Sequence, residues 1–267
     1  LAAFKALAGR SGAVVALDSS TGKILALVSS PSYDPTLLSS NAPADIRNSY
    51  EAYSKDGREP LSNRPLTLTL PPGSTFKLVV AAAALASGNF TPDSILPGPA
   101  TLKLPNSSKL LHNWKGAACS PSGELTLRRA LEVSCNTAFA WLGMQLGADA
   151  LRRQAEAFGF NNSVETPLVA AASVFPATLD DAQTAMSAIG QFDVRATVLQ
   201  MAMVAAAIAN RGMLTSPQMV QSVRSANLDV IESWQPREIG QAISPAVAAA
   251  LTSMMRSVVT NGTASSG

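Results

Sequence analysis

Residues 71–88, PPGSTFKLVVAAAALASG, place one lysine inside an almost entirely apolar run. After Lys77 the chain continues through Leu78, Val79 and Val80 to four alanines, which is the pattern of a helix buried on nearly every side. A charged ammonium in such a place costs several kcal/mol unless it is paired or gives up its proton. We therefore expect Lys77 to have a specific partner or an unusual pKa.

Ser74 precedes this lysine by three positions, and residues three apart share a helix face. The Pro-Pro-Gly stretch at 71–73 stops any earlier helix, so Ser74 begins a new one, where free N–H groups and the helix dipole favour negative charge. Burial beside that positive end lowers a lysine pKa. A shift from about 10.4 to about 7 requires roughly 4 to 5 kcal/mol, which burial can supply. A neutral Lys77 could then accept the hydroxyl proton of Ser74 and make it a nucleophile.

The Ser-x-x-Lys spacing alone is a weak signal, because the chain has a second copy at Ser20 and Lys23. That copy falls in an expected hairpin turn, where no helix would align its two ends. Lys77 also has a structural alternative, in which its alkyl stem is buried and its ammonium reaches solvent or a carboxylate. The apolar run and the helix start at Ser74 favour the chemical role.

The composition is that of an ordinary soluble globular protein, with 47% hydrophobic and 14% charged residues. A net charge of +2, with scattered basic residues, argues against nucleic acid as a partner. The apolar runs are too short for the roughly 20 residues of a membrane span. One histidine, His112, and two cysteines argue against a zinc site and a Ser-His-Asp triad, so we expect neither a metal nor a cofactor.

The order of predicted elements indicates an α+β protein. Residues 13–17 and 24–28 are β-rich and flank a turn with Gly22, which predicts a hairpin. Residues 36–70 show no clear periodicity, and residues 91–123, rich in Pro, Gly, Ser and Asn, predict a mostly irregular excursion. Helices are predicted for the buried run ending near Gly88 and for residues 127–134, 136–147, 149–159, 196–212 and 244–259. This order predicts a sheet covered by helices, with its remaining strands late in the chain.

A second serine lies in an apolar helical pattern. Leu127, Ala130, Leu131 and Ser134 recur at i, i+3, i+4 and i+7, which places Ser134 on the core-facing stripe of a predicted helix. A single serine in such a place more often bonds a backbone carbonyl than takes part in chemistry.

Five segments, in this order, resemble the transpeptidase domain of class B penicillin-binding proteins. They are GAVVALDSSTGKILALVSSPSYDP (12–35), NRPLTLTLPPGSTFKLV (63–79), ALEVSCNTAFAWLG (130–143), AIGQFDVRATVLQMAMVAAAIANRG (188–212) and SVVTNGTASSG (257–267). The resemblance implies the penicillin-binding transpeptidase (serine β-lactamase-like) fold over residues 1–267, with an antiparallel sheet flanked by helices and an all-helical subdomain. The Ala-rich composition, with more Arg than Lys, suits an actinobacterial member.

The resemblance also implies a mechanism. Ser74 would attack the penultimate D-Ala carbonyl of a peptidoglycan stem ending in D-Ala-D-Ala, with its backbone N–H as half of the oxyanion hole. Lys77 would be the acylation base, Ser134 would pass a proton to the leaving amine, and Asn136 would hold the substrate amide. A neighbouring stem would accept the acyl group as a cross-link, or water would do so in a carboxypeptidase side reaction. β-Lactams would acylate Ser74 as substrate mimics.

The implied setting is the extracytoplasmic face of the plasma membrane. The family resemblance implies an N-terminal anchor, which we expect to lie outside this chain. The expected partners are stem peptides, β-lactam antibiotics and proteins of cell-wall synthesis, with a role in cell division or cell shape.

One departure from the family concerns its third motif, Lys-Thr-Gly, which is absent from the sequence. The STGK at 20–23 comes too early in the chain to replace it. We therefore expect the C-terminal strands and the third motif to lie outside this chain. The carboxylate-binding groups and the other half of the oxyanion hole are left unassigned.

The two cysteines flank the second motif. Residues 119–126 can extend about 23 Å, more than the roughly 14 Å rise of the following helix, so Cys119 and Cys135 can meet. An exported location permits a disulfide. The bridge would close a loop of about 16 residues, worth roughly 3 kcal/mol. Two buried thiols are the alternative.

Two other classes of function stay open. A serine β-lactamase would share Ser74 and Lys77, but none of the glutamates begins the Glu-x-x-Leu-Asn segment of class A enzymes. A relative that uses a carboxylated lysine is compatible with the sequence. A β-lactam-sensing or structural domain would need no third motif, and its absence is the best support for that alternative.

Overall fold

The computed structural model describes residues 1–265. The N-terminal part of the chain forms a hairpin. After the short helix α1 (Ala2–Leu7), strands β1 (Gly12–Leu17) and β2 (Ile24–Ser30) pair in antiparallel register, as predicted. In the turn between them, the Asp18 carboxylate accepts hydrogen bonds from the backbone and hydroxyl of Ser20. Lys23 is exposed. The second Ser-x-x-Lys copy is therefore part of a surface turn.

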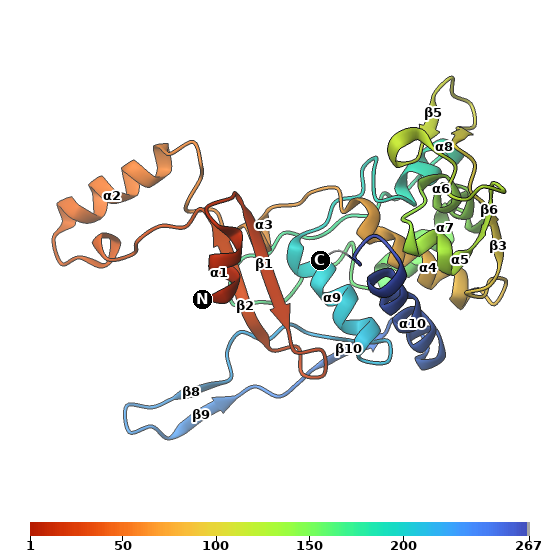
Figure 1. Ribbon diagram of the computed structural model, residues 1–267. Coiled ribbons are helices and arrows are strands. Elements are labelled where there is room, and N and C mark those ends of the chain that lie inside the picture. Colours follow the sequence, from red (N-terminus) through yellow and green to blue (C-terminus); the bar gives the residue numbers. More distant parts are fainter. Residues whose placement is uncertain (266–267) are drawn as a thin grey trace.

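A projecting arm follows the hairpin, formed by the 3-10 turn η1 (Leu37–Ser39) and helix α2 (Pro43–Lys55), and it points away from the bulk of the molecule (Figure 1). We predicted no periodic element here, and α2 corrects that prediction. The helix buries none of its residues, so it needs no apolar stripe. Its local signals are Pro43 in the first turn and an exposed Glu51–Lys55 pair at i, i+4.

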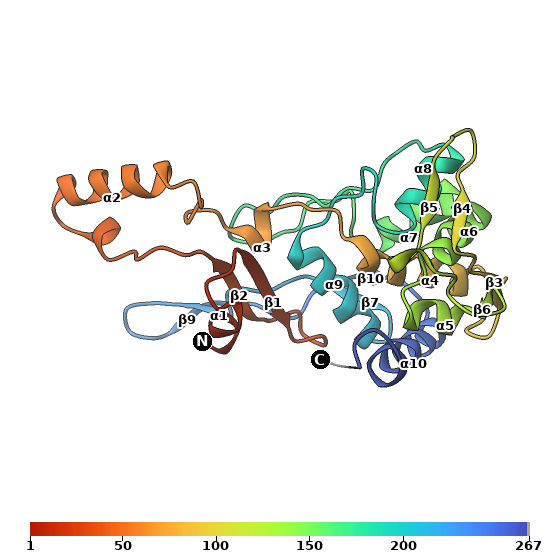
Figure 2. The same ribbon diagram turned by 45° about the horizontal axis from the view of Figure 1, so that its top comes forward.

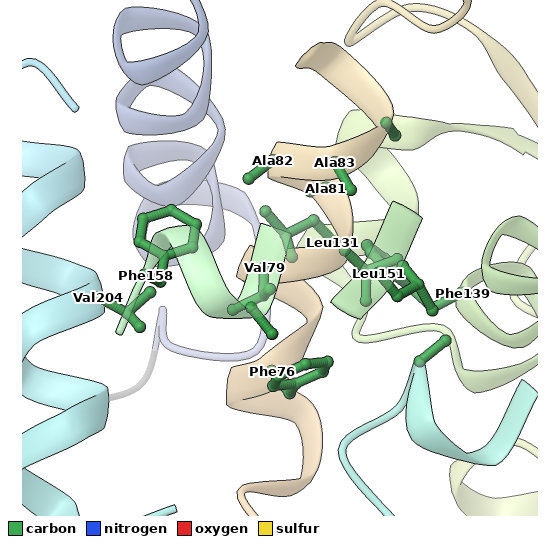
Figure 3. Packing of buried hydrophobic residues seen from close by; sticks show 14 of the residues in the cluster. Phe76, Val79, Ala81, Ala82, Ala83, Leu131, Phe139, Leu151, Phe158 and Val204 are labelled. Carbon is green, nitrogen blue, oxygen red and sulfur yellow. The ribbon is translucent and has the colours of Figure 1, made fainter. Parts of the chain in front are cut away.

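The buried apolar run forms the centre of the core. After α3 (Arg64–Thr67), the chain makes the 3-10 turn η2 (Gly73–Phe76) and continues directly into α4 (Lys77–Ala86). The predicted helix is therefore confirmed, although Ser74 itself lies in the 3-10 turn. Figure 3 shows α4 between side chains of the neighbouring helices, with Phe139 and Leu151 on one side and Phe158 and Val204 on the other. Phe76 packs its ring against those of Phe160 and Phe175 at centroid distances of 5.6 and 5.7 Å.

Helices gather around α4 on the side away from the arm (Figures 1 and 2). They are α5 (Leu127–Glu132), α6 (Asn136–Leu146), α7 (Ala148–Ala157) and α8 (Asp181–Ser187). Helix α9 (Val198–Ala209) contacts the β1 strand, and α10 (Pro245–Asn261) packs against α4, α5 and α9. The predicted helices after residue 126 are thus confirmed, except that the first of them ends before Ser134. Ser244 caps α10 by accepting from the Val247 N–H, as its Ser-Pro start indicates.

Short strands form the remaining ladders. β3 (Ile95–Pro97) pairs with β6 (Glu124–Thr126), and β4 (Thr101–Lys103) pairs with β5 (Leu110–His112), followed by the 3-10 turn η3 (Trp114–Gly116). Between α9 and α10, β7 (Met213–Thr215) pairs with β10 (Glu238–Gln241), and β8 (Ser222–Arg224) pairs with β9 (Val230–Ser233). All of these ladders are antiparallel, as expected. The excursion at 91–123 is more ordered than predicted, because three-residue strands are too short to show an alternating pattern.

The end of α5 corrects the prediction for Ser134. The helix stops at Glu132, and Ser134 follows with a left-handed backbone at φ 54°. The Ser134 N–H bonds the Leu131 carbonyl at 3.1 Å and the Cys135 N–H bonds the Ala130 carbonyl at 2.8 Å. These two bonds form a Schellman cap with Ser134 in the position usually occupied by glycine. Ser134 therefore lies in the tight connection between α5 and α6, off the helix stripe.

Candidate active site

The site is built around Lys77, whose side chain is 0% exposed at the start of α4. Its Nζ lies 2.8 Å from the Ser134 carbonyl oxygen and 2.8 Å from Oδ1 of Asn136. The same nitrogen is 3.1 Å from the Ser134 hydroxyl and 3.3 Å from the Ser74 hydroxyl. The structure thus brings the four predicted site residues together. Ser74 comes from η2, Ser134 from the α5–α6 connection and Asn136 from the first turn of α6, and all three contact Lys77.

Burial determines the charge state of Lys77. It lowers the pKa of the ammonium from its usual value near 10.5 to about 7. The Phe139 ring, 5.6 Å from Nζ, adds a weak preference for the cation. Within residues 1–265, Lys77 has no carboxylate in a salt bridge. The alternative that Lys77 reaches solvent or a carboxylate is therefore wrong.

The hydrogen bonds of the neutral amine leave its lone pair free for a hydroxyl. A neutral lysine has two N–H donors. The two shortest contacts, to the Ser134 carbonyl and to Oδ1 of Asn136, use both of them. The amide orientation is fixed, because Nδ2 of Asn136 donates to the His112 carbonyl at 3.2 Å. The lone pair is then directed to the hydroxyls of Ser74 and Ser134, and either can lose its proton to it.

The two hydroxyls are also bonded to each other. The Ser134 hydroxyl donates to Oγ of Ser74 at 2.9 Å. Ser74 is exposed, while Lys77 beneath it is buried. A molecule from solvent can therefore reach the Ser74 hydroxyl while the Lys77 amine stays out of water. Such an arrangement can move a proton among Ser74, Lys77 and Ser134 without a bulk solvent molecule.

A second segment braces the turn that carries Ser74. The Gly73 N–H bonds the Gly190 carbonyl at 2.9 Å, and Leu70 and Ala196 exchange two backbone hydrogen bonds. Gly190 has φ 69°, and a Cβ added there would lie 2.1 Å from the Gly73 carbonyl oxygen. From the sequence, residues 188–195 served only as part of a family landmark, and this brace was not predicted. The sequence signal that could have indicated the brace is Gly190 in the segment AIGQFD. Only the packing shows that this position needs a positive φ and lies close to the Gly73 backbone.

The two cysteines join the 91–123 excursion to the start of α6. Cys119 and Cys135 form a disulfide with an S–S distance of 2.03 Å. Cys135 is 1% exposed and is the residue before α6, so the bridge ties the 91–123 excursion to the helix that presents Asn136. His112 lies at the end of β5 with its side chain exposed, and only its carbonyl contacts the site.

The described part of the chain has neither a metal-binding cluster nor a membrane-spanning helix. Residues 1–265 contain no group of three or more His, Cys, Asp or Glu side chains placed to hold a metal ion. None of the helices described here combines the length and the apolar character needed to cross a membrane.

Comparison with known proteins agrees with this geometry. Residues 12–267 match the family model described as "Penicillin binding protein transpeptidase domain". The chain belongs to this penicillin-binding protein family. The peptidoglycan D,D-transpeptidase PbpA of Mycobacterium tuberculosis is 45% identical over 245 residues, covering 91% of this chain and 50% of the relative. The peptidoglycan D,D-transpeptidase MrdA of Escherichia coli is 33% identical over 244 residues, covering 87% and 37%.

Solved structures support the same family. A penicillin G acyl-enzyme complex of penicillin-binding protein A from M. tuberculosis has a TM-score of 0.94 at 43% identity, covering 98% of this chain and 62% of that chain. The expected transpeptidase fold is confirmed, as is the resemblance to class B penicillin-binding proteins. The similarity to mycobacterial penicillin-binding protein A agrees with the actinobacterial membership that the composition suggested. The chain spans about half the length of the mycobacterial relatives that it matches.

Proposed function

We propose that this chain acts as a peptidoglycan D,D-transpeptidase domain through a serine acyl-enzyme on Ser74. The observation that carries the proposal is a buried Lys77, with a pKa of about 7, in contact with the hydroxyls of Ser74 and Ser134. The relatives PbpA and MrdA are named for this activity, and the M. tuberculosis protein forms an acyl-enzyme with penicillin G. Residues 1–267 would work as one transpeptidase domain.

In the proposed acylation step, Oγ of Ser74 attacks the carbonyl carbon of the penultimate D-Ala. Its proton goes to neutral Lys77, and the backbone N–H of Ser74 donates to the developing oxyanion. Ser134 donates its proton to the leaving amine and recovers one from Lys77, so terminal D-Ala departs as a neutral amine. Asn136 donates from its amide to the substrate. The products are a Ser74 ester and free D-Ala.

In the second step, an amine of a neighbouring stem attacks the ester carbonyl. Its excess proton returns to Ser74 through the same Lys77 and Ser134 groups, and the new amide bond is the cross-link. Stem peptides ending in D-Ala-D-Ala are therefore the proposed substrates, and β-lactams would acylate Ser74 in their place. A disulfide beside the site and this substrate both support a location on the extracytoplasmic face of the plasma membrane. Protein partners would be those of cell-wall synthesis, with a role in division or cell shape.

The test follows the intact mass of the full-length protein with benzylpenicillin over hours, with Ser74→Ala in parallel. A stable adduct of one penicillin that is absent from the variant supports the acyl-enzyme. Release of D-Ala from a D-Ala-D-Ala stem peptide, and its transfer to an amine acceptor, then separates a transpeptidase from a β-lactam sensor. An adduct that clears within seconds would instead make the protein a β-lactamase. The absence of any adduct would refute the proposal.

A further inference from the structure

The 91–123 excursion contacts the first turn of α6 through one asparagine that the proposed mechanism does not use. Oδ1 of Asn113 accepts the Thr137 backbone N–H at 3.0 Å. Its Nδ2 donates to the carbonyl oxygens of Pro99 at 2.8 Å and Ala117 at 3.0 Å. The Asn113 carboxamide therefore has both of its ends bonded to backbone. Its neighbour His112 supplies the carbonyl that orients Asn136.

This contact replaces a missing helix cap. The first N–H groups of a helix have no partner within the helix, and the residue before the helix usually supplies one through its side chain. In α6 that residue is Cys135, which makes no capping hydrogen bond and whose sulfur is in the disulfide. Asn113, 24 residues earlier, caps the Thr137 N–H in its place. Thr137 is itself 0% exposed, so water could not take over this role.

The residues just before the capped Thr137 amide are those that contact Lys77. Asn136 immediately precedes Thr137, and its Oδ1 lies 2.8 Å from Nζ. Ser134 lies two positions before Asn136, and both its carbonyl and its hydroxyl contact the same nitrogen. The disulfide limits the distance between the excursion and Cys135. The rotation of the first helical turn is set by hydrogen bonds: Asn113 accepts the Thr137 N–H, the Thr137 hydroxyl donates to the Pro99 carbonyl at 2.8 Å, and Asn136 donates to the His112 carbonyl. Of these, the bond from Asn113 is the one that caps the helix backbone.

We propose that Asn113 is a positioning residue for the acylation of Ser74, because it holds the first turn of α6 so that Asn136 and Ser134 stay against Lys77. This inference rests on the proposed acyl-enzyme function. Loss of the cap would let the first turn of α6 shift and admit water to Lys77. A displacement of about 1 Å in a catalytic group can cost about 100-fold in rate. Water around Nζ would also remove part of the desolvation that favours the neutral amine.

The groups that face Lys77 make the hydration of its amine measurable. They are the Ser74 hydroxyl from η2, the Ser134 carbonyl and hydroxyl from the α5–α6 connection, and the Asn136 amide and Phe139 ring from α6. All are uncharged. A shift in the pH dependence of acylation therefore reports hydration of Lys77 rather than a changed ion pair.

The experiment compares the full-length wild type with Asn113→Ala, Asn113→Asp and Asn89→Ala. Asn89 is an exposed asparagine after α4 whose side chain makes no hydrogen bond within residues 1–265, so it controls for loss of an amide. Stopped-flow acylation by a chromogenic cephalosporin would give the limiting rate and the half-saturating concentration from pH 5 to 10. Hydrogen exchange would give the protection of the Thr137 amide, and thermal unfolding would check the fold.

We expect Asn113→Ala to lower the limiting acylation rate about 10- to 100-fold, with a smaller change in half-saturating concentration. In this variant the acid limb, which is the rise of the acylation rate with pH on the acid side of the profile, should move to higher pH by about one unit. The reason is that a hydrated Lys77 holds its proton more tightly. The Thr137 amide should exchange faster. Asn113→Asp keeps the acceptor for that amide, so at the alkaline plateau, where Lys77 is neutral, it should recover most of the rate. Asn89→Ala should match the wild type.

The contrary outcomes are distinct. A wild type that forms no adduct would overturn the acyl-enzyme function, and the role of Asn113 with it. A wild type that is acylated, with Asn113→Ala equal in limiting rate and acid limb, would overturn only the role of Asn113. A slower Asn113→Ala whose acid limb stays in place, and which Asn113→Asp fails to rescue, would show a purely structural role and also overturn it. If Asn113→Ala does not fold, Asn113→Leu, which has a side chain of similar size but no acceptor for the Thr137 amide, takes its place in the same comparison.

Discussion

The hydroxyl of Ser134 lies 2.9 Å from that of Ser74, although 60 positions separate the two residues in the chain. Nζ of Lys77 contacts both hydroxyls from below. Ser74 is at the surface and Lys77 is fully buried, so in the proposed mechanism the proton acceptor stays out of water while the Ser74 hydroxyl can meet a substrate. This separation is what lets a lysine serve as a base near neutral pH.

The first prediction concerns the pH dependence of acylation. Because Lys77 must be neutral to accept the Ser74 proton, the acylation rate should rise with pH and level off above its pKa of about 7. Stopped-flow acylation rates with a β-lactam from pH 5 to 10 measure this rise with pH directly. Lys77→Ala should lower the rate by about 100- to 10,000-fold. A rate that is independent of pH between 5 and 8 would contradict the role of Lys77.

The second prediction concerns stability. The pKa of Lys77 is about 7 in the folded protein and near 10.5 when exposed, so the unfolded chain binds the extra proton between these values. The free energy of unfolding contributed by this group therefore rises with pH from about 7 to 10.5, and its full cost is present below pH 7. Lys77→Met removes the cost. The stability of this variant relative to the wild type, from urea unfolding, should be highest near pH 6 and fall toward pH 10. An equal difference at both ends would argue against a buried, shifted lysine.

The third prediction concerns the left-handed backbone of Ser134, at φ 54°. A non-glycine residue there costs roughly 1 to 2 kcal/mol. Ser134→Gly should therefore keep or raise the melting temperature while acylation falls, since the hydroxyl is lost. Ser134→Ala retains the backbone strain and should lose activity without the gain in stability. Calorimetry and acylation rates on both variants test the two effects separately. Lower stability in the glycine variant than in the alanine variant would contradict the assignment.

The fourth prediction concerns the brace at Gly190. A Cβ there would lie 2.1 Å from the Gly73 carbonyl oxygen and would sit on a residue with φ 69°. Gly190→Ala should destabilise the fold by about 2 to 4 kcal/mol. It should also slow acylation at least about tenfold, because the turn that carries Ser74 must shift. Gly240→Ala is the matched control, since an added Cβ there meets no atom within 4 Å. Equal behaviour of the two variants would show that the brace is not needed.

The fifth prediction concerns the Cys119–Cys135 disulfide. Reduction reopens a loop with a separation of 16 residues, which should lower the free energy of unfolding by roughly 3 kcal/mol. Acylation of Ser74 should slow as well, because Cys135 lies between Ser134 and Asn136. Incubation with dithiothreitol, followed by denaturant unfolding and acylation assays, tests both effects. Acylation that is unchanged after complete reduction would show that the bridge does not support the site.

Local sequence patterns predicted many of the helices and strands. The apolar run after Lys77, the Ser-Pro start of α10 and the β-rich stretches around Gly22 each predicted an element that the structure contains. The exposed helix α2 was missed because it packs no face against the core. The short strands at 95–112 were missed because each has only three residues. In both cases the apolar periodicity that sequence analysis depends on is absent.

The amino-acid sequence by itself determined that this protein has a lysine buried at a helix start with a serine three residues before it. That pairing depends on neighbours within one helical turn, and it was enough to predict the lowered pKa of Lys77. Tertiary structure alone decided the brace at Gly190 and the cap that Asn113 gives to α6. Whereas the left-handed turn at Ser134 is closed by local bonds to Leu131 and Ala130, the brace and the cap both depend on backbone atoms from segments distant in the chain. Contacts of that kind leave no periodic trace in the sequence, because a single glycine or asparagine is enough to make them.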